Sequence, residues 1–170
     1  GVVDRIAEFE GPDSARIAEH WLKSHPSLAF VLRDNAGAMR GFVQVVPLEE
    51  CDDEDRSLDP AVDLAIRELD ELSDLREGET ARMARFWFDA QSYQAPSPIQ
   101  ERIFMLLRKT LAHVAGASHG PIVQRDPEKW RHRKDRFLRE LGEFEVDGHD
   151  FAIFSRDWRR FDAVEHLRRR

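Results

Sequence analysis

Two neighbouring stretches of the sequence carry side chains that could bind an anion or a planar molecule. Arg85 and Trp87 belong to the run RFWF, and the alternation of side chains along a strand predicts that both point to one face. A guanidinium near an indole ring can hold an anionic or planar ligand. Tyr93 and Gln94 follow in the next loop, so we expect a ligand cleft formed by Arg85, Trp87 and Tyr93. The alternative is that the rings of Trp87 and Tyr93 fill this space themselves.

The second stretch predicts the start of a helix at Pro98. Ser97 can accept a hydrogen bond from an unpaired amide of the first turn, and proline is tolerated at the first helical position. Gln100 stands three residues after Ser97, as in a capping box. The N-terminus of a helix attracts anions through its unpaired N–H groups and its dipole. The loop that ends at Ser97 is therefore a candidate site for a phosphate or a carboxylate.

Other reactive residue types are scattered along the chain. The seven histidines form no HxH or HExxH motif, and the single cysteine excludes an internal disulfide and a CxxC motif. We therefore predict no metal site. Cys51 adjoins the acidic residues 52–55, whose charges should raise the pKa of the thiol and make it a poor nucleophile. The whole acidic segment 49–59 is expected to be a solvated loop.

The composition indicates one globular domain that spans residues 1–170. Of the 170 residues, 41% are hydrophobic and 35% are charged. No apolar run approaches the roughly 18 residues that a membrane span needs. The single cysteine and the lack of a signal peptide predict a cytoplasmic protein. Because the chain begins with Gly1 rather than methionine, this end is interpreted as a tag remnant or as the cut edge of a longer protein. We expect a fragment of a longer chain, with the other domains of that chain or a small ligand as partners.

The charge distribution bears on nucleic-acid binding. The net charge of −7 argues against a general nucleic-acid-binding protein. Residues 120–170 nevertheless hold 13 Lys and Arg residues against 11 Asp and Glu residues, and the chain ends in three arginines. A module that contacts nucleic acid through this third of the chain is therefore retained as the least favoured interpretation.

Proline directly follows an N-cap residue three times, and each pair predicts the start of a helix. The pairs are Asp59-Pro60, Ser97-Pro98 and Asp126-Pro127. Apolar residues then recur every three or four positions, which predicts helices over about 60–69, 98–114 and 127–141, the last closed by Gly142. A further helix is predicted over 13–24.

Short apolar or alternating runs between these helices predict strands. They are residues 2–9, 28–33, 41–48, 80–88, 120–124, 143–146 and 150–155. Turn sequences at 34–37 and 147–148 predict two hairpins. The resulting order of elements is typical of an α+β fold, with a central mixed sheet, helices on both faces and a C-terminal hairpin. A helical tail is expected to follow.

This order of elements resembles the GNAT superfamily of N-acetyltransferases over nearly the whole chain. Gly41-Phe42 opens a strand after a hairpin, the run ARFWFD leads through a loop into a capped helix, and Leu141-Gly142 precedes the last hairpin, as in that family. The run RFWFDAQSYQAPSPIQ, followed by Asp157-Trp158-Arg159, is also similar to GNAT-like modules at the C-terminal ends of large bacterial ATPase-type regulators. The family resemblance implies acetyl-CoA as the cofactor and no metal.

The loop that binds the cofactor in this family departs from the family pattern here. The family seats the pyrophosphate of acyl-CoA on a loop of pattern Q/R-x-x-G-x-G/A at a helix N-terminus. Gln94 matches the first position, but Ser97 and Ile99 replace the two glycines, and Pro96 and Pro98 each lack an N–H. The resemblance thus implies weak or no acetyl-CoA binding. The residues that would contact the cofactor are Gln94, Ser97, Ile99 and Gln100.

The catalytic residues that the resemblance implies are also incomplete. The tyrosine that serves as general acid in the family is replaced by Leu138, whereas Glu79 and Asp89 are candidates for the general base. We therefore expect a GNAT-like domain with a degenerate acyl-CoA loop, serving as a ligand-sensing or interaction module of a larger regulator. The first alternative is an active acyl-CoA-dependent N-acetyltransferase, and the second is the nucleic-acid-contacting module.

Overall fold

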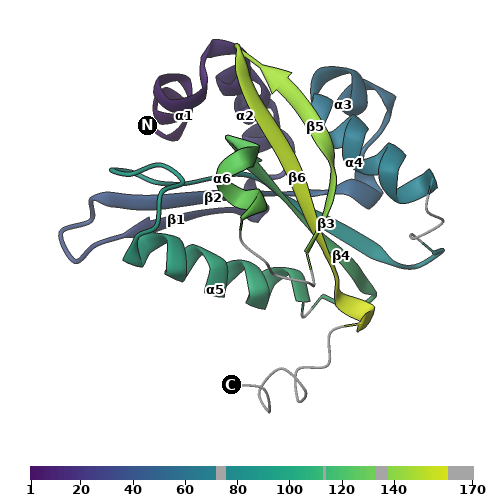
Figure 1. Ribbon diagram of the computed structural model, residues 1–170. Helices are drawn as coiled ribbons and strands as arrows, with labels where there is room; N and C mark the ends of the chain where they lie inside the picture. The colour runs from purple at the N-terminus through teal and green to yellow at the C-terminus, as the bar shows by residue number, and fades with distance from the viewer. Residues whose placement is uncertain (72–75, 113, 133–137, 161–170) are drawn as a thin grey trace.

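A computed structural model describes residues 1–71, 76–112, 114–132 and 138–160, which form a six-stranded mixed sheet with helices on both faces (Figure 1). The strands lie across the sheet in the order β1-β2-β3-β4-β6-β5. Only β3 and β4 are parallel neighbours. The strands are β1 (Ala29–Arg33), β2 (Met39–Pro47), β3 (Thr80–Asp89), β4 (Ala117–Arg125), β5 (Leu138–Val146) and β6 (His149–Asp157). This arrangement confirms the predicted α+β fold.

The helices divide between the two faces of the sheet. The helices are α1 (Val2–Glu10), α2 (Pro12–Ser24), α3 (Asp53–Leu58), α4 (Pro60–Glu71), α5 (Pro98–Ala112) and α6 (Pro127–Arg131). α1, α2 and α4 cover one face, where Trp21 and Leu69 belong to the first apolar core. α5 and α6 cover the other, where Ile103, Leu107 and Trp130 belong to the second (Figure 1). Short 3₁₀ turns lie at Pro26–Leu28, Leu48–Glu50 and Trp158–Arg160.

Strand β3 lies at the centre of the sheet, as predicted. Every residue from Met83 to Asp89 is buried. Phe86 and Phe88 pack into the first core, whereas Trp87 packs into the second, beneath α5. A strand with partners on both sides and helices over both faces has no polar face, which explains the three consecutive rings.

A β-bulge at Arg85 breaks the alternation of β3. Two successive residues of β2 pair with Ala84 and Phe86, so Arg85 is an extra residue in its strand. Arg85 therefore lies on the same face as Phe86, with its guanidinium carbon 4.2 Å from the centre of that ring. Trp87 lies on the opposite face. The prediction that Arg85 and Trp87 share a face is wrong, because pairing with β2 rather than local alternation sets the register.

The predicted N-terminal strand over residues 2–9 is also wrong, because this segment is helix α1. Val2, Ile6 and Phe9 stand at spacings of four and three, so they line one side of a helix and pack into the first core. Gly11 ends the helix with φ of 107°, and α2 follows at once. The helix predicted over 13–24 is confirmed as α2.

Two further predicted elements differ from the structure. The acidic segment, predicted as a loop, contains α3, which begins with a reciprocal capping box between Asp52 and Asp55. The helix predicted over 127–141 ends at Arg131, and Leu138 and Leu141 belong to β5. β5 is a strand because it pairs along its length with β6, an interaction that the spacing of apolar residues does not reveal. Gly142 is accordingly not a helix cap, and Phe137, predicted to face inward, lies outside the described residues.

Candidate functional site

Strands β3 and β4 begin side by side and separate toward their C-terminal ends. Their last pair is Ala84–Ile122, and the residues beyond it, 85–89 and 123–125, do not pair with each other. Strands that part in this way leave backbone N–H and C=O groups without ladder partners. The sequence predicts its ligand cleft at this end of β3, and we call the space the β3–β4 gap.

Side chains of the protein itself bridge the β3–β4 gap. The indole Nε1 of Trp87 donates to the carbonyl of Val123 at 2.7 Å. Gln94 makes two bonds, since its Nε2 donates to the carbonyl of Trp87 at 3.3 Å and its Oε1 accepts from the amide of Arg125 at 2.9 Å. Trp87 is 0% exposed and Gln94 is 7% exposed. Side chains of the protein therefore satisfy three backbone groups in the gap, namely the carbonyls of Trp87 and Val123 and the amide of Arg125.

The N-terminus of α5 is held by the same loop. The hydroxyl of Ser97 accepts from the amide of Gln100 at 3.0 Å, which is one half of the predicted capping box. The side chain of Gln100 instead donates to the carbonyl of Gln94 at 3.1 Å and is buried. Ile99 packs over Gly41, where a Cβ would come within 2.7 Å of its side chain. Three of the four predicted cofactor residues, Gln94, Ser97 and Gln100, are thus joined by hydrogen bonds, whereas Ile99 packs against β2.

Tyr93 points away from the β3–β4 gap toward α1. Its hydroxyl donates to Oε1 of Glu10 at 2.7 Å, and the guanidinium of Arg125 lies 4.3 Å from the centre of its ring. Burial raises the pKa of Glu10, although Arg85 and the hydrogen bond from Tyr93 oppose that shift. Burial also raises the pKa of Tyr93, and the charge of Glu10 adds to this effect. The hydroxyl is therefore a donor rather than an acid at neutral pH.

Arg85 is committed to a buried ion pair on the first-core side of β3. Its Nε lies 2.8 Å from Oδ2 of Asp59, and both side chains are fully buried. The same carboxylate accepts from Nε1 of Trp21 at 2.8 Å and from the amide of Ala61 at 3.0 Å. The structure therefore places Arg85 on the far side of the strand from Trp87, so these two predicted ligand residues do not converge.

The two candidate bases lie at opposite ends of β3. Asp89 shapes the loop after the strand, because its Oδ1 accepts from the amides of Gln91 at 2.8 Å and Ser92 at 3.4 Å. Burial alone would raise the pKa of Asp89, but these hydrogen bonds hold it below its ordinary value. Glu79 precedes the first residue of the strand and Asp89 is its last, so roughly the whole length of β3, about 30 Å of backbone, lies between them.

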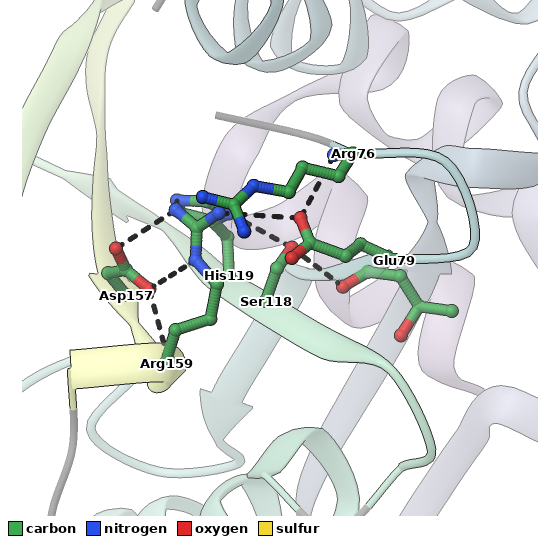
Figure 2. Close-up of polar contacts among 7 residues, drawn as sticks. Arg76, Glu79, Ser118, His119, Asp157 and Arg159 are labelled. Atoms are coloured by element: carbon green, nitrogen blue, oxygen red, sulfur yellow. Dashed lines mark hydrogen bonds and ion pairs between the residues drawn. The ribbon is translucent and has the colours of Figure 1, made fainter. Parts of the chain in front are cut away.

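Glu79 belongs to a separate polar cluster, which Figure 2 shows at the start of β4 and the end of β6. Its Oε2 accepts from the amide of Arg76 at 2.9 Å and faces Nη1 of Arg159 at 3.4 Å. Arg159 also bonds both carboxylate oxygens of Asp157 and lies 3.4 Å from Nε2 of His119. The cluster joins residues up to 80 positions apart, and nothing in the sequence predicted it.

A groove of about 610 Å³ lies between α5 and the second-core face of the sheet. Side chains of α5, β4, α6, β5 and β6 line it, and among them are Phe104, Gln124 and Trp130. A smaller hollow of about 390 Å³ lies outside the β3–β4 gap, against Gln94, Arg125 and Lys129. The sequence did not predict the larger groove, because it assigned two of its walls, α6 and β5, to one helix.

Three further sequence predictions concern metal ligands, the thiol of Cys51 and membrane spans. Within the described part of the chain, no three His, Cys, Asp or Glu side chains are grouped so that they could hold a metal ion. Burial and the nearby carboxylates of Asp55 and Asp59 raise the pKa of Cys51 to about 12. The thiol is therefore a poor nucleophile. None of the described helices is long and apolar enough to cross a membrane.

Comparison with known proteins identifies the fold. No family model and no curated protein matches the sequence. The NatC complex bound to Gag peptide and CoA matches with a TM-score of 0.51 and 9% identity, over 86% of this chain and 80% of that chain. The C-terminal condensation domain of Ebony in complex with beta-alanyl-dopamine matches with a TM-score of 0.50 and 12% identity, over 85% and 80%. At these identities the likeness concerns the fold alone, and it agrees with the GNAT-like arrangement that the order of elements predicts.

Proposed function

We propose that this chain is a ligand-binding or interaction module built on a GNAT-like acyltransferase fold, and that it does not transfer acyl groups through the β3–β4 gap. The observation that carries the proposal is the closure of that gap by Trp87 and Gln94. Three hydrogen bonds between 2.7 and 3.3 Å join the two strands where they have parted. Chemistry in this gap would need these bonds to be broken first.

Acetyl-CoA, the cofactor that the fold family implies, does not fit the residues at this place. A pantetheine arm between the strands would compete with the ring of Trp87 for volume and with Gln94 for backbone groups. The N-terminus of α5 is also a poor cradle for pyrophosphate, since Pro98 has no N–H and the amide of Gln100 is bonded to Ser97. These features support a degenerate cofactor loop.

The partners of such a module are the finer part of the proposal. The resemblance of RFWFDAQSYQAPSPIQ to modules at the ends of large ATPase-type regulators favours other domains of a longer chain, or a small ligand, as the partner. The alternative of a nucleic-acid-contacting module receives no support from the net charge of −7.

Calorimetric titration with acetyl-CoA and CoA tests the proposal. We expect no saturable heat with either compound. The matched variant is Ser97→Asp, because aspartate still caps a helix but its charge repels a phosphate. A low-micromolar dissociation constant for wild type that Ser97→Asp abolishes would place pyrophosphate at α5, overturn the proposal and favour the acyltransferase.

A further inference from the structure

We infer that the groove beside α5 binds a small aromatic molecule that carries an amine at one end and a carboxylate at the other. The inference rests on the proposed function, which it deepens by naming a site and a ligand class for the module. The volume of about 610 Å³ lies within the range of small-molecule sites. The groove is separate from the β3–β4 gap, which Trp87 and Gln94 close.

Gln124 gives the groove a hydrogen-bonding group that the protein leaves unused. The residue lines the groove and is 4% exposed, and its Oε1 has no hydrogen-bond partner among the described residues. Gly120 and Ile122 line the groove from the same face of β4, as the alternation of a strand requires. A buried carbonyl oxygen without a donor is unfavourable. Rotation of the terminal amide toward the groove would let an N–H group of a ligand satisfy this oxygen.

Aromatic rings form much of the wall. Phe104 and Trp130 both contact the buried ring of Trp87, with centroid separations of 5.2 and 5.9 Å. Trp158 packs over Gly120, where a Cβ would come within 2.6 Å of the indole nitrogen. The core therefore holds these rings in place before any ligand arrives. Such a wall favours a flat apolar body that stacks on the rings.

Two side chains of α5 place opposite charges along the rim. Glu101 and Arg108 both line the groove, and neither has an ion-pair partner among the described residues. They are seven residues apart, which is about 10.5 Å along a helix axis. Arg131, on the other rim, is by contrast engaged by Glu140 at 2.7 Å. Among the residues that the structure describes, Glu101 thus offers an unpaired anion at the rim and Arg108 an unpaired cation.

The topology fixes which charge accompanies Gln124. Because α5 connects the parallel strands β3 and β4, it runs antiparallel to both. Glu101, in the first turns of α5, therefore lies toward the C-terminal end of β4, where Gln124 stands. Arg108 lies toward the other end, near Gly120. An amine would meet two acceptors at the first end, a carboxylate would meet a guanidinium at the second, and the aromatic body would span the distance between them.

The probe is 4′-(aminomethyl)biphenyl-4-carboxylate, which has this order of groups on a rigid frame. Two analogues each lack one end, namely biphenyl-4-carboxylate without the amine and 4-(aminomethyl)biphenyl without the carboxylate. We expect wild type to bind the full probe in calorimetric titration, and each analogue about tenfold more weakly, since each loses one charged hydrogen-bonding end.

Variants assign each end of the probe to a residue. Gln124→Leu should weaken the full probe about tenfold but leave biphenyl-4-carboxylate unchanged, because that analogue lacks the group that Gln124 would bind. Arg108→Ala should likewise weaken the full probe about tenfold, but it should leave 4-(aminomethyl)biphenyl unchanged, because that analogue lacks the carboxylate that Arg108 would bind. Arg102→Ala is the matched control, since Arg102 is an exposed arginine of the same helix that does not line the groove. A purely structural effect would weaken all three compounds alike.

The absence of binding to wild type, or an equal loss for all three compounds in the variants, overturns the inference. Thermal unfolding would reveal whether Gln124→Leu folds. If it does not, titration of the three compounds into wild type and Arg108→Ala still tests the inference. Acetyl-CoA is titrated into the same samples. Saturable binding of acetyl-CoA contradicts the proposed function. If neither the biphenyl probe nor acetyl-CoA binds, the proposed function stands and only the inference about the groove is contradicted.

Discussion

Trp87 and Gln94 supply through their side chains the hydrogen bonds that β3 and β4 no longer make to each other. The carbonyl of Val123 and the amide of Arg125 would otherwise be buried without partners where the strands part. A tryptophan serves this place well, because one side chain both fills volume and donates a hydrogen bond. The closed gap is therefore a property of these residues and needs no ligand.

The buried pair of Arg85 and Asp59 yields a prediction about stability. Arg85→Met leaves the carboxylate of Asp59 in the core without its cation, which should lower the free energy of unfolding by about 3–5 kcal/mol. Adding Asp59→Asn removes the uncompensated charge and keeps an acceptor for Trp21. The double variant should therefore recover part of the loss in urea unfolding. A double variant as unstable as the sum of the two single variants would contradict this reading of the pair.

Glu10 yields a prediction about pH. Its ordinary pKa is 4.5, and burial raises it in the folded chain. A carboxyl group whose pKa is raised in the folded chain favours the folded state least when it is ionised. The free energy of unfolding therefore falls as the pH rises from its unfolded pKa toward its folded pKa. The stability of wild type relative to Glu10→Gln should therefore fall as the pH rises above the ordinary pKa of 4.5.

Urea unfolding at several pH values measures this difference. Glu8→Gln is the control, because Glu8 lies on the same helix and its side chain is 62% exposed. We expect no comparable trend for that variant. A difference between wild type and Glu10→Gln that stays constant, or grows with pH, would show that the carboxylate is not penalised by its burial.

At the scale of elements, the starts of α4 and α5 were predictable because capping is local. Asp59 and Ser97 each accept from an amide of the helix that follows them. The end of α6 and the identity of β5 were not predictable, since pairing with β6 decides them. In the candidate site, too, local contacts were predictable from the sequence and long-range contacts were not. Gln94, Ser97 and Gln100 are neighbours in sequence and meet in space, whereas the bond between Glu10 and Tyr93 joins residues 83 positions apart.

Packing of α5 on the sheet gives the prediction at this scale. Leu107 is buried in the second core, and Leu107→Ala should lower the free energy of unfolding by about 2–5 kcal/mol. Met105, two residues earlier, is 61% exposed. Met105→Ala should therefore change the free energy of unfolding by less than about 0.5 kcal/mol. Equal effects of the two substitutions would mean that α5 presents a different face to the sheet.

At the scale of the whole molecule, the N-terminal helices meet the turn of the C-terminal hairpin, although β5 and β6 lie at the far edge of the sheet from β1. The carboxylate of Asp147, in the turn between β5 and β6, accepts from the amides of Asp13 and Ser14 at 3.3 and 2.9 Å. Gly11 packs so tightly against this turn that a Cβ would lie 2.5 Å from Asp147. The first-core face of the sheet is thereby covered, and the open groove of the molecule lies on the α5 face.

The central claim is that the β3–β4 gap is closed, and hydrogen exchange of the Trp87 indole N–H tests it most directly. The signal can be assigned in an NMR spectrum by its loss in Trp87→Phe. We predict slow exchange, because the N–H is buried and bonded to Val123, and we predict the same rate when acetyl-CoA is added in excess. Rapid exchange in the free protein, or a change of the signal on addition of acetyl-CoA, would contradict the claim.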